Sequence, residues 1–340
     1  MKIHNAILLL VTSLLVFSNS VYSEIVSPKI IQNDNKIKEI FTSRGGMEGW
    51  SWVSFMVGLD GTPSDIIVID YSGQQRYIKS SVDYVKNLTF SPATVNGVPT
   101  IGERDIFLPH SFSGSGYNVG KVTPVFARDY QEILDTINSL NGISTARTLI
   151  DKLKEDHTKS LYEHAMAAYL ESLYSYKNQN FLEYMRQSQI ALNLHEYLPL
   201  KMLSNTVVNL FEAQLYYGYF TEAEDTLWAM KKIEGLNLSD ELAEDFQNQL
   251  KNKINSNLPI KVKGKLTPLG SWIYYNNFQK FKITKVNGVI DSVELRCIGL
   301  HQKYSTDLQK ELEIPTSAKR CVTMVQGQKG TTFELIQIST

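Results

Sequence analysis

Two cysteines are the residues best suited to covalent chemistry in this chain. Cys297 and Cys321 are its only cysteines, and both lie in the last fifth of the sequence. Two lone cysteines that are close in sequence can bind a metal or form a disulfide, and the disulfide is favoured in an exported protein. The N-terminal leader described below indicates export. We therefore predict a Cys297–Cys321 disulfide that stabilises the last part of the chain by roughly 2–4 kcal/mol.

The other residues of catalytic type are scattered. Beyond the leader, histidines occur at His110, His157, His164, His195 and His301. Two turns of one helix would align His157 with His164, but no cysteine or carboxylate completes an obvious metal-binding set. Neither a Gly-x-Ser-x-Gly elbow nor a His-Glu-x-x-His motif occurs. We therefore predict no catalytic residues, no metal ligands and no cofactor, in a protein that is not an enzyme.

A glycine-rich segment after Ser113 has the composition of a phosphate-binding loop. The spacing from Gly114 to Gly120 is one residue too long, and Val122 stands where such a loop needs a hydroxyl for its metal ion. We interpret residues 113–123 as a linker.

Residues 1–23 have the pattern of a secretory signal peptide. Lys2 gives a positive start, an apolar run follows, and small polar residues lead to Ser23. The apolar run is shorter than the roughly twenty residues that span a bilayer. We predict cleavage between Ser23 and Glu24 and export to the periplasm, with no integral membrane segment after processing. An uncleaved N-terminal anchor is the alternative.

The balance of charged residues argues against nucleic acid as a class of partner. The chain has 340 residues, of which 34 are Lys or Arg and 35 are Asp or Glu. Without a basic excess to neutralise phosphates, nucleic acid is not an expected partner. The apolar content supports real cores, and the length is typical of two or three domains.

The stretch from Gly49 to Pro99 has the pattern of a strand–strand–helix–strand module. Large apolar residues alternate from Val53 onward, which is the period of a half-buried strand. Asp60-Gly61 favours a tight turn before a second, β-branched strand. A helical stripe follows, formed by Ile78, Val82 and Val85.

These landmarks carry a family resemblance. In order they are Gly49, Asp60-Gly61, Asp65-Ile66, Val68, Ser72-Gly73 and Phe90-x-Pro92-Ala93-x-x-Asn96-Gly97-x-Pro99. The set resembles the C-terminal domain of the TonB energy-transducer family, and the resemblance implies a ββαβ domain over residues 24–112. Pro28 is the only proline before Pro63, so no stiff extended spacer precedes the module. The resemblance therefore implies the binding end of the family without the parts that harvest membrane energy.

The resemblance also implies a partner site. In that family the terminal strand of the domain receives a short peptide from the receptor, and the matching stretch here runs from Ile101 to Leu108. The expected contact residues are Ile101, Arg104, Asp105, Ile106 and Phe107. Edge addition needs backbone groups and alternate side-chain pockets. The charged segment before Ile106 is equally typical of an edge protected from pairing. We expect Pro109 to end the strand.

Residues 124–257 have helical periodicity. Two longer helix pairs look alike, with Phe181 and Phe220 at equivalent points about one repeat length apart. The pattern resembles degenerate tetratricopeptide repeats, and an irregular helical bundle is the alternative. A polar-faced helix from Leu242 to Ile254 would cap the array.

Residues 258–340 are β-rich. Strands are expected over residues 272–275, 278–286, 289–298, 321–325 and 333–338. Asn287-Gly288 predicts a hairpin between two of them. The expected result is a small disulfide-tied sandwich or sheet, which makes the whole chain an α+β multidomain protein.

The sequence thus favours a periplasmic protein–protein interaction module of the TonB family, linked to outer-membrane transport. Its partners would be proteins, including an outer-membrane receptor or TonB-system components. Two alternatives remain: an envelope scaffold or assembly factor that works through its helical repeats, and an enzyme with its site in the C-terminal part.

Overall fold

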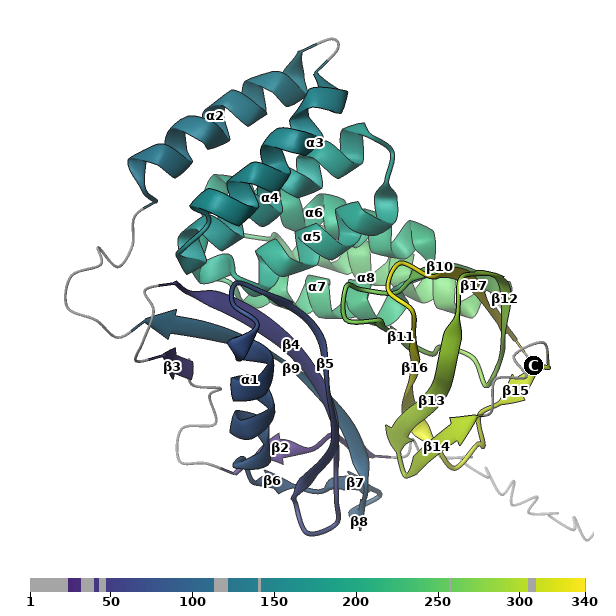
Figure 1. Cartoon of the computed structure of the whole chain (residues 1–340). Coiled ribbons are helices and arrows are strands. Elements are labelled where there is room, and N and C mark those ends of the chain that lie inside the picture. The colour runs from purple at the N-terminus through teal and green to yellow at the C-terminus, as the bar shows by residue number, and fades with distance from the viewer. Residues whose placement is uncertain are drawn as a thin grey trace, which may run out of the picture.

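The computed structural model describes residues 24–31, 40–42, 47–112, 122–139, 142–256, 258–304 and 310–339. Over these ranges the chain is a mixed α+β protein with eight α-helices and several small sheets, which confirms the broad fold class. An N-terminal sheet with one helix lies below an array of helices, and the C-terminal strands lie beside both (Figure 1). The expected signal peptide, Ser23 included, lies outside the described residues, as does most of the expected linker. Glu24 is the first described residue.

The N-terminal part is built on a four-stranded sheet of order β3-β9-β4-β5. Its elements are β3 (Ile40–Thr42), β4 (Gly49–Val57), β5 (Pro63–Ser72), α1 (Arg76–Lys86) and β9 (Gly102–Phe112). Helix α1 covers one face of this sheet (Figure 1). The stripe predicted for that helix supplies Val85, which is fully buried against Val53 and Ile106. Apolar alternation on the strands therefore meets the helical stripe in one core.

Both predicted turns of this region are present. Gly61 has a φ of 78° and closes the connection between β4 and β5, where the amide of Gly58 donates to the carbonyl of Thr62. Asn96 and Gly97 have φ angles of 53° and 78°. They join β7 (Ala93–Val95) to β8 (Val98–Thr100). Positive φ is the conformation for which these residue types are favoured.

Short strands near the start of the described chain were not expected from its polar composition. They are β1 (Ile25–Val26) and β2 (Lys29–Ile30), which pair with β7 and with β6 (Phe90–Ser91). Strand β3 pairs in parallel with the end of β9.

Pro109 does not end strand β9, contrary to the prediction. The strand continues to Phe112, and Pro109 lies opposite Trp50 of β4. The pairing with β3 begins only at His110. A strand tolerates proline where the missing N–H would face away from a neighbouring strand. Pro109 therefore indicates which way the alternate amides of β9 point.

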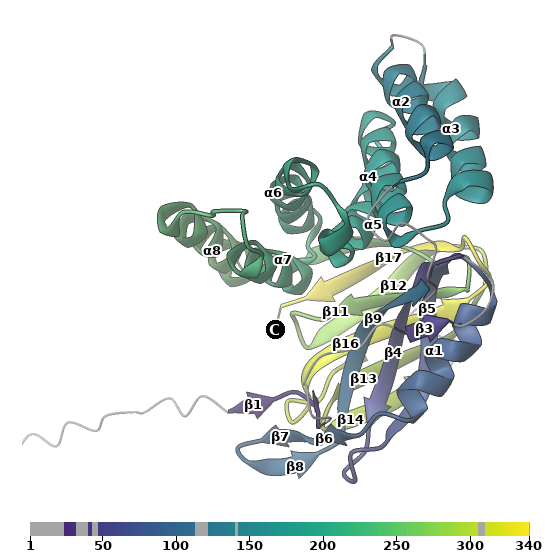
Figure 2. The ribbon, with the colours of Figure 1, turned by 90° about the vertical axis from the view of Figure 1, so that its left-hand side faces the viewer.

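Seven helices follow, each packed on the next along an array that Figure 2 shows from the side. They are α2 (Pro124–Asn138), α3 (Ile143–Lys152), α4 (Leu161–Lys177), α5 (Phe181–Asn193), α6 (Leu200–Tyr217), α7 (Phe220–Lys232) and α8 (Asp240–Asn255). Local signals set their ends: Ser160 and Glu163 form a capping box, and Gly218 ends α6 with a φ of 82°. Phe181 and Phe220 are the first residues of α5 and α7. A π-helical turn (Leu153–His157) and a 3-10 turn (His195–Tyr197) connect helices.

The C-terminal part consists of two four-stranded antiparallel sheets. One has the order β10-β17-β12-β15, and the other β11-β16-β13-β14. The strands are β10 (Ile260–Lys265), β11 (Ser271–Tyr275), β12 (Lys280–Asn287), β13 (Ile290–Ile298), β14 (Leu300–Tyr304), β15 (Leu312–Glu313), β16 (Lys319–Gly327) and β17 (Thr332–Ile338). The predicted Asn287-Gly288 hairpin is wrong, because β12 and β13 belong to different sheets. The turn carries the chain from one sheet to the other.

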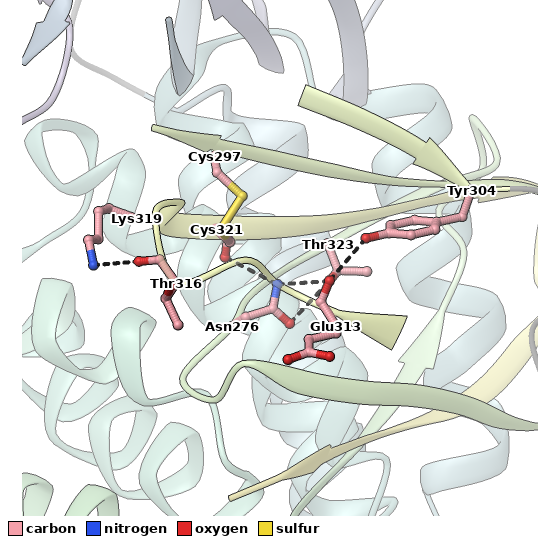
Figure 3. The surroundings of a disulfide bond; sticks show 8 residues. All are labelled: Asn276, Cys297, Tyr304, Glu313, Thr316, Lys319, Cys321 and Thr323. Atoms are coloured by element: carbon pink, nitrogen blue, oxygen red, sulfur yellow. Dashed lines mark hydrogen bonds between the residues drawn. A yellow bond between two sulfur atoms is a disulfide. The ribbon is translucent and has the colours of Figure 1, made fainter. Parts of the chain in front are cut away.

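The predicted disulfide is present. Cys297 on β13 and Cys321 on β16 are bonded, and both are buried (Figure 3). The two strands are neighbours in one sheet, so the bond links two adjacent strands. The main-chain carbonyl of Cys321 also accepts from the amide of Asn276, which fixes the chain after β11.

One of the hydrophobic clusters connects the three parts of the chain. Trp50 of β4, Phe211 of α6 and Trp272 of β11 belong to a single cluster of buried side chains. A buried hydrogen bond crosses the same region, from the hydroxyl of Tyr274 to the carbonyl of Gly218 at 2.6 Å. The sheet, the helices and the C-terminal strands therefore hold fixed positions relative to one another. Within the described ranges, no helix is both long and apolar enough to cross a membrane.

Replacing both cysteines by alanine is expected to lower the free energy of unfolding by about 2–4 kcal/mol, because the unfolded chain regains the entropy of an open loop. Urea denaturation followed by tryptophan fluorescence measures the change. A reductant should destabilise the wild-type protein and leave the double variant unaffected. Equal stability of the two proteins under oxidising conditions would contradict the prediction.

A candidate binding cavity between three parts of the chain

A cavity of about 740 Å³ lies where the N-terminal sheet, the helices and the C-terminal strands meet. We call it the junction cavity. Its walls include Trp52 and Asp70 from the sheet, Arg186 from α5, Tyr219 from the turn before α7, and Trp272 and Tyr275 from β11. Aromatic walls with a few charged groups in a space of this size are typical of sites for small ligands.

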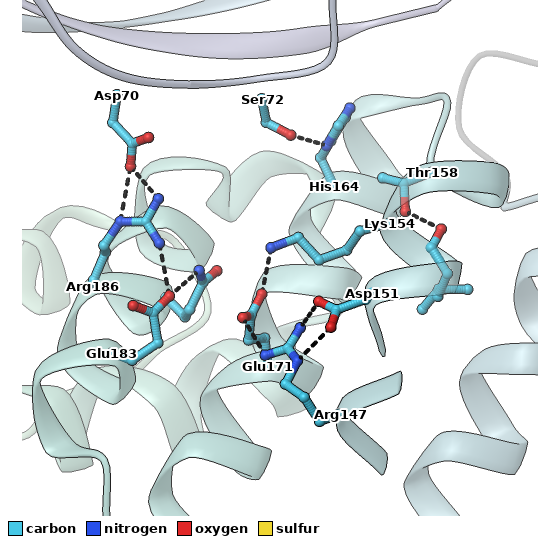
Figure 4. A network of polar contacts seen from close by, with 12 residues as sticks. Asp70, Ser72, Arg147, Asp151, Lys154, Thr158, His164, Glu171, Glu183 and Arg186 are labelled. Atoms are coloured by element: carbon cyan, nitrogen blue, oxygen red, sulfur yellow. Dashed lines mark hydrogen bonds and ion pairs between the residues drawn. The ribbon is translucent and has the colours of Figure 1, made fainter. Parts of the chain in front are cut away.

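Ion pairs line the helical wall of the cavity (Figure 4). Arg147 on α3 pairs with Asp151 and, at 2.8 Å, with Glu171 on α4, and Lys154 pairs with the same glutamate. Glu171 is only 6% exposed. Burial alone would raise the pKa of its carboxyl, but Lys154 and Arg147 hold that pKa below its usual value. These charges are therefore satisfied within the helical wall.

A second ion pair connects the sheet to the helices. Arg186 on α5 donates to Asp70 on β5 and to Glu183 on its own helix (Figure 4). The Asp70 side chain is 3% exposed, and burial raises the pKa of its carboxyl, while Arg186 opposes the rise. Arginine keeps its proton in proteins, so the pair holds a positive charge at a buried carboxyl. Removing one partner would leave the other charge buried and unpaired.

His164 on α4 forms a third contact between helices and sheet. Its ring lies 3.0 Å from the Ser72 hydroxyl through Nδ1 and 3.0 Å from the carbonyl of Glu48 through Nε2. A carbonyl only accepts, so Nε2 carries the proton and Nδ1 accepts from Ser72. Burial lowers the pKa of His164 to about 4. The neutral ring is thus the form that fits this contact (Figure 4).

Glu222 on α7 stands at another wall of the cavity with one buried carboxylate oxygen. Its Oε2 has no hydrogen-bond partner among the described residues. Burial raises the pKa of Glu222 to about 8, and the negative charges of Asp225 and Asp105 add to the rise. Asp105 itself accepts from Trp52 Nε1 at 2.5 Å and from the Tyr275 hydroxyl at 2.8 Å. Glu222 therefore has a buried oxygen in this wall that could still form a hydrogen bond.

Lysines line the wall contributed by the C-terminal strands. They are Lys263 and Lys265 on β10 and Lys329 in the connection from β16 to β17. None of the three pairs with a carboxylate among the described residues, and all three are exposed. The cavity therefore has one wall of uncompensated positive charge.

The residues expected to bind a partner lie together on β9 or directly before it, but they contact other parts of this chain. The carbonyl of Ile101 accepts from the amide of Gly299. Arg104 donates to the carbonyl of Pro28 at 2.6 Å. These contacts tie the start of β9 to the N-terminal strands and to the C-terminal part.

The next three predicted residues are also engaged. Asp105 binds Trp52 and Tyr275 as described, Ile106 is 3% exposed, and Phe107 stacks on Trp50 with ring centroids 5.2 Å apart. The charged segment is therefore partly or wholly buried instead of forming an exposed charged edge.

The histidines do not form a site. His157 bonds Asp129 at 3.3 Å, whereas His164 faces the sheet, so the two are not brought together for one ligand. In the described part of the chain, no group of three or more His, Cys, Asp or Glu residues is arranged to hold a metal ion.

The junction cavity was not predicted from the sequence. Its charged residues occur in stretches that read as ordinary strands and helices, although Asp70 ends a β-branched run and signals a polar group at a buried position. Trp52, Arg186 and Trp272 are each separated by more than eighty residues along the chain. Only the packing of the three parts brings them together.

Comparisons with protein-family models, curated proteins and solved structures found no match to this chain. The TonB-family resemblance therefore stays a prediction, carried by the landmarks between Gly49 and Pro99.

Arg186→Met is expected to destabilise the protein by about 3–5 kcal/mol, because Asp70 would remain buried without its partner. The Asp70→Asn/Arg186→Met double variant should recover most of that loss. Urea denaturation of four proteins, the wild type, Asp70→Asn, Arg186→Met and the double variant, completes a double-mutant cycle. Arg128→Met is the control, since Arg128 pairs at the surface with 71% of its side chain exposed and should cost less than about 1 kcal/mol. Additive losses across the cycle would contradict the proposed coupling.

Stability is expected to fall as the pH drops from about 6.5 towards 4. The pKa of His164 is about 4 in the folded protein and about 6.5 in an unfolded chain, so the unfolded state binds more protons in this window. The contribution, about 3 kcal/mol, is fully present above pH 6.5 and is lost towards pH 4.

Urea denaturation at several pH values measures this slope. His164→Gln cannot take up the proton, so the dependence of stability on pH should become weaker in this variant. Part of the dependence should remain, because burial also lowers the pKa of His110 to about 4. His195→Gln, at a partly exposed position, is the control for the loss of a histidine outside this contact. An unchanged slope in His164→Gln would show that this contact does not set the acid sensitivity.

Proposed function

We propose that the chain is an exported TonB-family protein that acts as a protein–protein interaction module in the periplasm and is linked to outer-membrane transport. It binds an extended peptide by adding it to the edge of β9. Three features support the proposal: the leader pattern before Glu24, the ordered family landmarks, and a disulfide of the kind kept in oxidising compartments.

The observation that carries the proposal is the open side of β9. From Gly102 to Pro109 the strand pairs with β4 on one side, and no other described strand pairs with it before His110. The opposite edge of the sheet is occupied, because Arg296 donates to the carbonyl of Asp65 and Thr267 to that of Ile69 on β5. Main-chain groups along an open edge are what edge addition of a peptide requires.

Pro109 identifies the amides that face this edge. Alternate residues of a strand direct their N–H groups to opposite sides. Pro109 has no N–H to donate to β4. We therefore infer that every second residue counted from Pro109, including Phe107 and Asp105, directs its main-chain N–H away from β4. The neighbouring amide of Leu108 then belongs to the ladder with β4.

A main-chain ester at Phe107 tests the proposal. Nonsense suppression with phenyllactic acid replaces the N–H by oxygen and retains the side chain. The probe is a fluorescent peptide selected on the mature protein from a random phage-displayed library. The ester should weaken its binding about three- to tenfold, the net loss of one hydrogen bond.

The matched control is an ester at Leu108, made with the hydroxy acid of leucine. It should lower the thermal stability, because a bond to β4 is lost, and leave the affinity of the folded protein for the peptide unchanged. Wild-type affinity in a folded Phe107 ester would remove the binding site from β9.

A scaffold working through the helical array is the second candidate. It is favoured by large side chains that the helices leave in solvent: Tyr176, Tyr216 and Trp228 are 58%, 78% and 63% exposed. If peptides selected on the protein lose affinity with Tyr216→Ser and not with the Phe107 ester, the helical array is the interaction surface.

A further inference from the structure

Strand β11 runs along the junction cavity between two ends of different charge. At its last residue, Tyr275 holds Asp105 through its hydroxyl, and its main chain is close enough to hydrogen-bond Glu222. At its first residue, Ser271 pairs with Gln326 of β16. Four strand steps separate these residues, which is about 13 Å. The acidic end of the cavity is thus about 13 Å from the opposite end, the length of β11.

The opposite end is basic. Lys265 is the last residue of β10, and Lys329 lies in the connection between β16 and β17. The amide of Gly330 donates to the carbonyl of Leu266, so the two lysines follow adjacent segments of main chain. The amide of Gly327 donates to the carbonyl of Gly270, directly before β11. Both lysines therefore lie near the start of β11, and neither pairs with a carboxylate among the described residues.

The acidic end of the cavity has an oxygen atom without a hydrogen-bond partner among the described residues. Buried carboxyl oxygens in folded proteins nearly always have a partner, and Oε2 of Glu222 has none in the described chain. Burial raises the pKa of Glu222 to about 8, and an ammonium bound beside it would lower that pKa, so the carboxyl releases its proton when the cation binds. Trp52 and Tyr275, both bonded to Asp105, line the cavity at this end. Aromatic side chains beside a carboxylate favour a cationic group. The other cations of the cavity, such as Arg147 and Arg186, already bind carboxylates of their own wall.

We propose that the junction cavity binds a short zwitterionic peptide of about four residues, with its N-terminal ammonium at Glu222 and its C-terminal carboxylate at Lys265 and Lys329. An extended chain of that length matches the separation of the two charged ends. Its side chains contact the apolar walls, to which Ile69, Leu266 and Trp272 contribute. This site is separate from the edge of β9, so it does not depend on the function proposed above.

The test uses the full mature chain and a pool of tetrapeptides made from alanine, leucine and phenylalanine with free termini. Ultrafiltration and mass spectrometry identify the retained peptides, and calorimetry gives the affinity of the best one. Acetylating its amine or amidating its carboxyl should each weaken binding about tenfold or more, because each removes a charge-assisted contact.

Variants assign the two ends. Glu222→Gln keeps the shape of the side chain and should weaken the free peptide about tenfold, with no further loss when the amine is acetylated. Glu224→Gln is the control, since Glu224 is exposed on the same helix. Lys265→Gln/Lys329→Gln should act on the carboxyl end in the same way, with Lys261→Gln, exposed on the same strand, as its control. Thermal melting confirms that each variant is folded.

Three outcomes would overturn the proposal. The first is no retained tetrapeptide, and the second is equal binding of free and capped peptides. The third is retention that survives Glu222→Gln but is lost with the Phe107 ester, which would place the peptides on β9 and leave the cavity without this ligand.

Discussion

Arg296 is the constraint on which the contact between the two ends of the chain depends. Its side chain is fully buried, and its guanidinium donates to Glu294, to the Ser54 hydroxyl and to the carbonyl of Asp65. Burying this charge is tolerable only when its donors are satisfied together. Because the acceptors lie on β13, β4 and β5, few relative positions of the two sheets satisfy them all. Arg296 therefore restricts how the N-terminal sheet can lie against the C-terminal strands.

The other contacts between parts of the chain have the same character. Asp70 with Arg186 and His164 with Ser72 join the sheet to the helices through buried polar groups, while the shared apolar core supplies the area. Apolar packing alone tolerates small shifts, whereas buried polar pairs lose their bonds when they shift. The junction cavity is therefore a space of fixed shape, enclosed by parts that cannot slide past each other without leaving charges unpaired.

Local patterns in the sequence predicted local structure well. The Asp60-Gly61 and Asn96-Gly97 turns, the stripe of α1, the helices near Phe181 and Phe220 and the disulfide are all present, because each depends on neighbouring residues or on compartment chemistry. Strand β10 was not predicted, although its residues alternate between buried and exposed. Three of its six residues are lysines and one is glycine, so only Ile260 and Val262 carry the apolar alternation.

Features that depend on packing between distant segments could not be predicted in this way. Asn287-Gly288 has the local pattern of a hairpin, but whether the two flanking strands pair is decided by the other strands of each sheet. The engagement of Asp105 and the existence of the cavity depend on Tyr275, 170 residues further along. Only the resemblance pointed to β9 as a partner site, and it could not show that Asp105 and Phe107 contact other parts of the same chain.

The shared core has a consequence for the order in which the molecule can form. A ribosome delivers the N-terminal sheet first, then the helices, and last the strands that carry Trp272 and Arg296. Until those strands arrive, Trp50 and the core face of α6 have no complete cover, and Asp65 lacks its guanidinium partner. Contacts spanning over 200 residues make late folding steps slow and leave apolar surface open to wrong associations. The C-terminal strands thus complete the core that the earlier parts begin. A chain shortened at its C-terminal end would lose these strands and also the cover that they give to the N-terminal sheet and the helices.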